Sequence, residues 1–384
     1  MSVYLDNAAT TAISAAALEE YNRVSLDLFA NPSSLHSKGL AAKAYMEECR
    51  RDIASILGVK PANIYFTSGG TLGDNLAIFS ACNRVRDCAS ARVITTSVEH
   101  HAAINCFKEL EKRGFDVVYL PVSANGVDMQ ALEDALTDNT VLVNMMHVNN
   151  ETGHIFPIFE AAELVHNKCP SALFHVDGVQ SFVKEDFKLI GTYVDSFAAS
   201  AHKFHGPRGV GFVYLSNRFK LHPYVLGGGQ EKDIIGGTEN LPGIGAMTVA
   251  AKSAYQHLDA HRQHVIGLRD MLWQGLSTIN GVERVSPEDG SPYILNVAFR
   301  IPAEIMLNAL NGRGICVSAG SACASNSKSS HVLTAMGYPQ QTLSGAVRFS
   351  FSHTNTQEDI RCTLGAVNDI ISSVFTKFNP RGRR

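Results

Sequence analysis

LFHVDGVQSFVKEDFKLIGTYVDSFAASAHKFHGPRGVGFVYL, residues 173–215, is the stretch that decides the fold of this chain. It contains three short runs with the length of β-strands, Leu173–Asp177, Ser196–Ser200 and Gly211–Leu215. The runs are largely apolar and do not alternate strictly with polar residues, which is typical of strands covered by helices on both faces of their sheet. We therefore predict three buried strands of one sheet.

The same kind of run recurs toward the N-terminus, and helical patterns lie between the runs. Asp128 is suited to cap one helix, and a second helical pattern over residues 159–168 stops before Pro170. Strand–helix alternation over roughly residues 60–215 predicts a mostly parallel α/β sheet. The further predicted strands are Ile64–Thr67, Val93–Thr96, Val117–Leu120 and Val141–Met145.

The pattern changes after Gly243, where residues 244–279 are mainly helical in character. The mixed strands and helices that follow predict a smaller α+β domain. We expect a large domain over residues 15–255 and a small domain built from residues 1–14 and 256–384. The predicted elements of the small domain are strands at Tyr293–Arg300, Ile315–Ser318 and Val347–Phe351 and helices at Ala303–Asn311 and from Gln357 to about Phe375.

Composition argues against several classes of protein. With 384 residues, 45% of them apolar, the chain is long enough for more than one lobe. A charged fraction of 18% and a net charge of −3 do not indicate disorder, nucleic-acid binding or membrane-surface binding. The eight cysteines form no CxxC pair, and no apolar stretch suggests a signal peptide or a membrane span. We expect a cytoplasmic protein with free thiols and no metal site.

Lys203 follows the end of a predicted strand and precedes a Gly-Pro turn. Ligands of α/β sheets bind at such strand ends. A partly buried lysine amine is more readily neutral, and it can then bond to an aldehyde. Asp177 ends another strand and could pair with a protonated pyridine nitrogen, although it could equally cap a helix. With Gln180 close by, these residues suit pyridoxal 5'-phosphate (PLP).

Other polar residues also follow strand ends. The glycine-rich turn Thr67–Thr71, which includes Gly70, opens a helical pattern and could cradle a phosphate with Ser200 and His202. His100 could stack on the cofactor ring, and Asn150 could hydrogen-bond its phenolic oxygen. Each residue alone also has an ordinary structural explanation, so the hypothesis depends on their combination.

The stretch SAGSACASNSKSS, residues 318–330, is rich in small and polar residues and predicts a mobile loop. It carries Cys323, whose thiolate would be a nucleophile. Arg348 lies in a strand-like run, where an arginine needs an anionic partner, and a substrate α-carboxylate would be a natural one. Asn31, within an Asn-Pro-Ser-Ser stretch, is expected at the same entrance.

From about residue 3 to residue 360, these motifs resemble, in order, the NifS/IscS-type cysteine desulfurases. Those enzymes belong to the class V branch of fold-type I PLP enzymes. Each motif alone is weak, but the combination is specific. The motifs are YLDNAATT (4–11), TSGGTLGDN (67–75), EH (99–100), HVNNE (147–151), HVDGVQ (175–180), SAHKFHGP (200–207) and GGGQE (227–231).

The resemblance implies a fold-type I transferase that converts L-cysteine to L-alanine and leaves a persulfide on Cys323. It implies Lys203 as the residue that bonds PLP and His100 as a ring-stacking residue that can also move a proton. It implies a homodimer in which Thr238 reaches the phosphate of the other subunit, and a sulfur-acceptor protein such as an iron–sulfur scaffold or a thiolation enzyme for tRNA or cofactors. The other implied contacts are Asp177 with the ring nitrogen, Gln180 and Asn150 with the phenolic oxygen, Gly70, Thr71, Ser200 and His202 with the phosphate, and Arg348, Asn31 and Asn150 with the substrate.

Two positions depart from the family pattern. Leu72 stands where the family often has Glu, and Ile235 stands where an Arg usually follows the GGGQE segment. The second change removes a positive charge near the site shared between subunits. Three alternatives remain open: a selenocysteine lyase, a class V aminotransferase without a nucleophilic cysteine, and an inactive partner in a sulfur-transfer complex. The presence of Lys203, Asp177 and Cys323 argues against the last.

Overall fold

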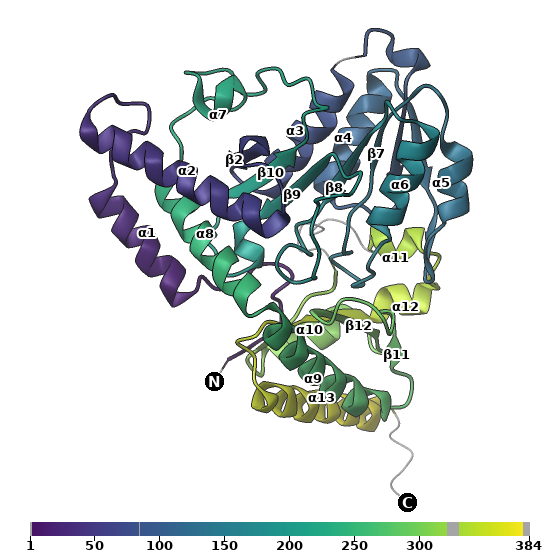
Figure 1. The fold of residues 1–384 in the computed structure, drawn as a ribbon. Helices are drawn as coiled ribbons and strands as arrows, with labels where there is room; N and C mark the ends of the chain where they lie inside the picture. The colour runs from purple at the N-terminus through teal and green to yellow at the C-terminus, as the bar shows by residue number, and fades with distance from the viewer. Residues whose placement is uncertain (1, 84, 321–329, 379–384) are drawn as a thin grey trace, which may run out of the picture.

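A seven-stranded sheet forms the centre of the larger part of the molecule (Figure 1). The computed structural model describes residues 2–83, 85–320 and 330–378, with side chains described through residue 373. The strand order is β2-β10-β9-β8-β7-β3-β4, and only β10 runs antiparallel to its neighbours. The strands are β2 (Ile64–Thr67), β3 (Arg92–Thr96), β4 (Asp116–Leu120), β7 (Thr140–Asn144), β8 (Leu173–Asp177), β9 (Ser196–Ser200) and β10 (Gly211–Leu215).

Helices cover both faces of this sheet. Alternate residues of one strand point to opposite faces, so Phe174 joins the hydrophobic cluster beneath α2, α5, α6 and α8 while Leu173 joins the cluster beneath α3 and α4. The central strands are therefore buried on both sides, as their apolar sequences predict. The helices are α2 (Ser37–Leu57), α3 (Gly70–Cys82), α4 (His101–Lys112), α5 (Met129–Ala135), α6 (Ile158–Lys168) and α8 (Leu241–Gln256).

A three-stranded antiparallel sheet of order β11-β12-β14 forms the smaller part of the molecule. Its hydrophobic cluster unites helices near the C-terminus with the N-terminal Val3 and Leu5. That junction is possible because β1 pairs in parallel with β13. The elements are β1 (Val3–Tyr4), α9 (Leu258–Ser277), β11 (Glu283–Arg284), β12 (Ile294–Ala298), α10 (Ala303–Asn311), β13 (Ile315–Cys316), β14 (Ala346–Ser350) and α13 (Gln357–Phe378).

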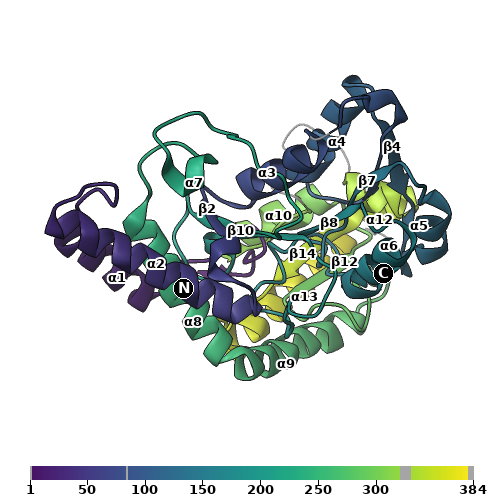
Figure 2. The ribbon, with the colours of Figure 1, turned by 45° about the horizontal axis from the view of Figure 1, so that its top comes forward.

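All seven strands predicted for the large sheet are confirmed to within one residue at each end. By contrast, α1 (Ala15–Asp27) and α2, which project together from one side of the molecule, were not predicted (Figures 1 and 2). Their outer surfaces carry exposed apolar side chains, such as Leu18 and Leu40, which obscure the usual polar and apolar faces. The remaining elements are β5 (Val122–Ser123), β6 (Gly126–Val127), α7 (Gln230–Asp233), α11 (His331–Ala335) and α12 (Gln340–Gly345).

Two further expectations concern location. Among the helices that the structure describes, none combines the length and apolar character needed to cross a bilayer. No disulfide joins the seven cysteines in the described residues.

Candidate active site

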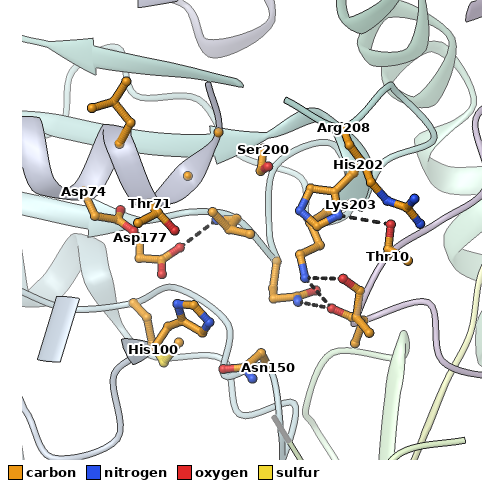
Figure 3. A pocket seen from close by; sticks show the side chains of 18 of the residues that line it. Thr10, Thr71, Asp74, His100, Asn150, Asp177, Ser200, His202, Lys203 and Arg208 are labelled. Atoms are coloured by element: carbon orange, nitrogen blue, oxygen red, sulfur yellow. Dashed lines mark hydrogen bonds between the residues drawn. The ribbon is translucent and has the colours of Figure 1, made fainter. Parts of the chain in front are cut away.

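A cavity of about 460 Å³ opens at the carboxyl ends of the central strands. This volume lies in the range typical of small-molecule sites. Ten of the residues predicted for the site line it together (Figure 3). They are Gly70, Thr71, His100, Asn150, Asp177, Gln180, Ser200, His202, Lys203 and Arg348.

The parallel strands explain this convergence. Asp177 is the last residue of β8 and Ser200 is the last residue of β9, and these strands are hydrogen-bonded neighbours. A single 3₁₀ turn, Ala201–Lys203, carries the lysine from β9 into the cavity. Carboxyl ends of parallel strands meet at one edge of a sheet, so residues far apart in the sequence become neighbours there.

Lys203 is held by the N-terminal segment of the chain. Its Nζ donates hydrogen bonds to the carbonyl oxygens of Ala8 and Ala9, at 2.6 and 2.8 Å. The side chain is only partly exposed. These two carbonyl oxygens carry no formal charge, so they orient the amine through hydrogen bonds alone.

Asp177 is a buried carboxyl at the inner wall of the cavity. Its Oδ1 accepts a hydrogen bond from the backbone N–H of Val179, at 3.0 Å. Burial raises the pKa of Asp177 to about 6, although the Val179 N–H and the Lys203 charge act in the opposite direction. A protonated ring nitrogen placed against this group would supply the charge partner that keeps it ionised.

A second buried acid, Asp74, lies behind Asp177 and was not predicted from the sequence. His175 Nε2 is 3.2 Å from Asp74 Oδ1, and His175 Nδ1 is 2.8 Å from Ser196 Oγ. Burial raises the pKa of Asp74 above its usual value, and the nearby Asp177 raises it further. This chain of three residues supports the wall that carries Asp177.

His100 is the N-cap of α4, where its Nδ1 accepts a hydrogen bond from the backbone N–H of Ala102 at 3.2 Å. That bond fixes the neutral tautomer with its proton on Nε2. Burial, reinforced by the charge of Lys203, lowers the pKa of His100 to about 4. A neutral, oriented imidazole at the cavity wall is suited both to stacking on a flat ring and to donating a hydrogen bond from Nε2.

The start of α3 forms a cradle in the cavity wall. Its N-cap is Gly69, at φ +147°, and no side chain among the described residues caps it. A Cβ atom at Gly70 would come within 2.5 Å of Val179 Cγ2, so a side chain there would crowd the wall. The first backbone N–H groups of a 13-residue helix therefore face Ser200, and such a helix start favours an anion.

The opposite side of the cavity includes residues that were not selected from the sequence. Thr10 Oγ1 is 3.1 Å from His202 Nδ1, and Arg208 is an exposed cation at the rim (Figure 3). Thr10 lies within a motif that the family resemblance quoted, and Arg208 directly follows the Gly-Pro turn. Both residues could have been selected from the sequence by their positions in or next to these two motifs.

Arg348 differs from its expected arrangement. We expected its charge to need a substrate carboxylate, but Asp6 already supplies an anionic partner, with Arg348 Nη2 2.9 Å from Asp6 Oδ1. The guanidinium also donates to Asn150 O at 2.7 Å, while its buried Nε has no partner among the described residues. The charge of the buried arginine is therefore already balanced by Asp6 within the chain. A substrate carboxylate would be a second anionic partner and not the first.

Three predicted site residues do not line the cavity in the described chain. Asn31 is exposed on the connection between α1 and α2, where its Oδ1 accepts from Ser33 N. Thr238 is exposed after α7. Cys323 lies outside the described residues.

The sequence and fold match a well-characterised group of proteins. The family model "Aminotransferase class-V" matches residues 3–362. The chain is 40% identical to "Cysteine desulfurase 2" of Trichormus variabilis, an alignment that covers 96% of this chain and 93% of that protein. It is 37% identical to "Putative cysteine desulfurase IscS 1" of Bacillus subtilis, covering 96% and 98%.

The chain belongs to the class V aminotransferase family, within its NifS/IscS-type branch.

Solved structures agree with this assignment. A "NIFS-LIKE PROTEIN" superimposes with a TM-score of 0.91 at 36% identity, covering 97% of this chain and all of that one. "SspA in complex with cysteine" superimposes with a TM-score of 0.79 at 31% identity, covering 93% of this chain and all of the other. The expected family and fold class are therefore confirmed.

Members of this family depend on PLP, and the described residues fit that cofactor. The uncapped start of α3 suits the phosphate, the buried Asp177 suits a protonated ring nitrogen, and Lys203 lines the same cavity with an amine for the aldehyde. These three features have different chemical requirements, and PLP meets all of them in one molecule.

Proposed function

We propose that this chain is a cysteine desulfurase, which removes sulfur from L-cysteine, releases L-alanine and leaves a persulfide on Cys323. The observation that supports it most is the cavity in which Lys203, Asp177, His100 and Arg348 converge. The names of the relatives, including a structure with bound cysteine, support the choice of substrate.

The cofactor would be held at three points. Lys203 would bond its aldehyde, Asp177 would pair with its ring nitrogen, and His100 would stack on its face. Gly70, Thr71, Ser200 and His202 would surround the phosphate, and Gln180 and Asn150 would contact the phenolic oxygen. Bound PLP supplies an electron sink that weakens the bonds at Cα of the substrate.

The chain's own side chains would supply the remaining steps. Arg348 and Asn150 would orient the substrate α-carboxylate, with Asn31 near the entrance. Lys203 would move a proton from Cα, and neutral His100 would exchange a proton with the substrate. The Cys323 thiolate would attack the substrate sulfur, so that an S–S bond forms while the Cβ–S bond breaks. Cysteine and a thiol thereby become alanine and a persulfide, without an external oxidant.

The persulfide would pass to an acceptor protein, either an iron–sulfur scaffold or a thiolation enzyme. We place this activity in the cytoplasm, because the described cysteines are free thiols. We also propose the division into a large domain, 15–255, and a small domain, 1–14 with 256–384. The hydrophobic cluster that joins Val3 and Leu5 to residues 265–370 supports that division.

We further propose a homodimer in which Thr238 reaches the phosphate site of the partner. Large apolar side chains are exposed at the end of α1, on the α1–α2 connection and before α7, namely Leu26 (76%), Phe29 (64%), Leu35 (90%) and Leu226 (86%). Exposed apolar groups of this size mark an interface. We propose a second copy of this chain as the partner, because Asn31 and Thr238 lie close in sequence to these exposed residues but do not line the cavity of the chain that carries them.

Sedimentation of the purified protein should give the mass of a dimer. Leu35→Asp together with Leu226→Asp should shift it to monomer and reduce cofactor binding. The matched control is Ile305→Asp, since Ile305 is also an exposed apolar residue, at 51%, but lies on α10. A wild-type monomer with full cofactor content would contradict the dimer.

The decisive experiment for the function is Cys323→Ser. This variant should bind PLP and change its absorbance when cysteine is added, yet form almost no alanine, because an alcohol cannot replace a thiolate nucleophile. Mass spectrometry of the wild type after cysteine should show one added sulfur on the peptide with Cys323. The control Cys362→Ser removes an exposed thiol on α13 and should retain activity.

Two results would contradict this assignment. Sulfur mapped to Cys316 or Cys362 would show that the nucleophile is wrong. Alanine release by Cys323→Ser at the wild-type rate would exclude the desulfurase mechanism and favour selenocysteine lyase or another elimination reaction.

A further inference from the structure

Lys184 is a buried lysine that the proposed chemistry does not use. It follows β8 and lines a small cavity on the far side of Lys203, together with Tyr293. Its Nζ lies 5.5 Å from the centroid of the Tyr293 ring. Buried lysines are rare unless paired, and this one has no carboxylate within ion-pair distance among the described residues.

The backbone before Lys184 is strained. Val183 has φ +53°, in the left-handed region that a β-branched residue seldom occupies. Such a conformation is unfavourable for a valine and persists only where the surroundings enforce it. Here it lies between two turns, closed by Phe182 N to Gly178 O and by Glu185 N to Ser181 O. The strain accompanies the placement of a lysine in the interior.

The ammonium group bonds to a residue of the candidate active site. Lys184 Nζ is 3.3 Å from Gln180 Oε1, and Gln180 Nε2 donates to Ala8 O at 2.9 Å. A lysine can only donate and a carbonyl can only accept, so these two partners allow one orientation of the amide. The same Ala8 oxygen also accepts from Lys203. The amide nitrogen has two hydrogens, and one N–H therefore remains for a ligand in the cavity that Gln180 lines.

We propose that Lys184 is a positioning residue, which fixes the Gln180 amide so that an N–H group rather than the carbonyl faces the phenolic oxygen of bound PLP. This inference rests on the proposed function for the cofactor but goes beyond it, because it assigns the direction of a hydrogen bond. A donor at this point stabilises negative charge on the ring oxygen, whereas a carbonyl would repel it.

The charge of Lys184 is a separate matter from its hydrogen bond. Burial lowers its pKa to about 7, and Lys203 and Arg348 act in the same direction while Glu185 opposes them. His205 and His202 also lie close enough to sense it. A neutral amine still donates, so the orientation of Gln180 persists on both sides of this pKa.

The test measures cofactor absorbance as a function of pH in the purified holoenzyme, without substrate. Lys184→Met removes the donor but keeps the apolar stem, and Gln180→Leu removes the amide. Each should raise the pH at which the visible band titrates by about one unit, the size expected for a lost hydrogen bond to a charged group. The double variant should shift no further than the larger single shift, because both changes remove one interaction.

Two further variants separate orientation from other effects. Lys184→Gln is neutral but can donate to Gln180, so it should restore the wild-type midpoint if orientation matters. Lys188→Met is the matched control: this exposed lysine of the same stretch also donates to a carbonyl oxygen, that of Ser55, and its loss should change nothing.

Each result has a defined meaning. A Lys184→Met variant with the wild-type midpoint would overturn the positioning role. A Lys184→Gln variant that behaves like Lys184→Met would also overturn it, because it would show that the charge of Lys184 alone is responsible. Additive shifts in the double variant would also overturn it. A wild-type protein that binds no PLP would instead refute the proposed function.

Discussion

Lys203 and Arg348 are two cations that line one cavity, but the chain holds them in different ways. Lys203 follows the carboxyl end of β9 in the seven-stranded sheet. Its hydrogen bonds to the N-terminal segment are to the uncharged carbonyl oxygens of Ala8 and Ala9. Arg348 comes from β14 of the three-stranded sheet, and the same segment meets it with the carboxylate of Asp6.

This difference shows how one segment can prepare two cations for different tasks. The N-terminal segment adds a carboxylate beside Arg348 but only carbonyl oxygens beside Lys203, and a charged amine cannot attack an aldehyde. Carbonyl oxygens orient the amine with a weaker bias. The ion pair with Asp6 fixes the position of Arg348 while its Nε has no partner among the described residues.

Substitution of Lys203 should have the largest effect. Lys203→Ala should abolish both the visible absorbance of covalently held cofactor and the release of alanine, while circular dichroism shows an intact fold. The control Lys188→Ala removes an exposed lysine and should leave both signals unchanged. An unaltered spectrum in Lys203→Ala would show that Lys203 does not bond the cofactor. The difference in task proposed for Lys203 and Arg348 would then be wrong.

The ion pair of Arg348 should give smaller and graded effects. Arg348→Lys should lower kcat/KM for cysteine by about 10²-fold, mainly through KM, because a lysine cannot keep the bonds to Asp6 and Asn150 and also hold the substrate carboxylate in the same geometry. Asp6→Asn keeps the guanidinium and its bond to Asn150, so it should cost only about 10-fold. Steady-state kinetics measures both, with cofactor absorbance as the control. If Asp6→Asn lowers kcat/KM as much as Arg348→Lys does, Arg348 acts by stabilising the structure around it and not by binding the substrate.

The elements around Lys203 could be predicted from the sequence because their signals are local. Apolar runs mark β8 and β9, and polar residues at the ends of these strands must meet at one edge of the sheet. Asp177 and Lys203 therefore reach the cavity as expected. The glycine-rich turn at the start of α3 follows the same logic.

The elements around Arg348 could not be predicted in the same way, because their partners are distant. Asp6 lies 342 residues before Arg348, and no local pattern indicates that β1 joins β13. The orientation of Gln180 by Lys184 was likewise not visible, because it depends on a left-handed valine that propensity disfavours. Asn31 lies exposed on the α1–α2 connection, and α1 packs on α8, which comes much later in the sequence, so no local pattern indicates either.

The N-terminal segment also determines when the cavity is completed during synthesis of the chain. It leaves the ribosome first, but β14 follows only some 342 residues behind Asp6, which at roughly 5–20 residues per second is a delay of roughly 20 to 70 s. The seven-stranded sheet can assemble in that interval, since its last strand ends at Leu215. The cavity stays open on the side of Arg348 until translation is nearly over, so a chain that stalls before this residue would expose Lys203 in an incomplete site.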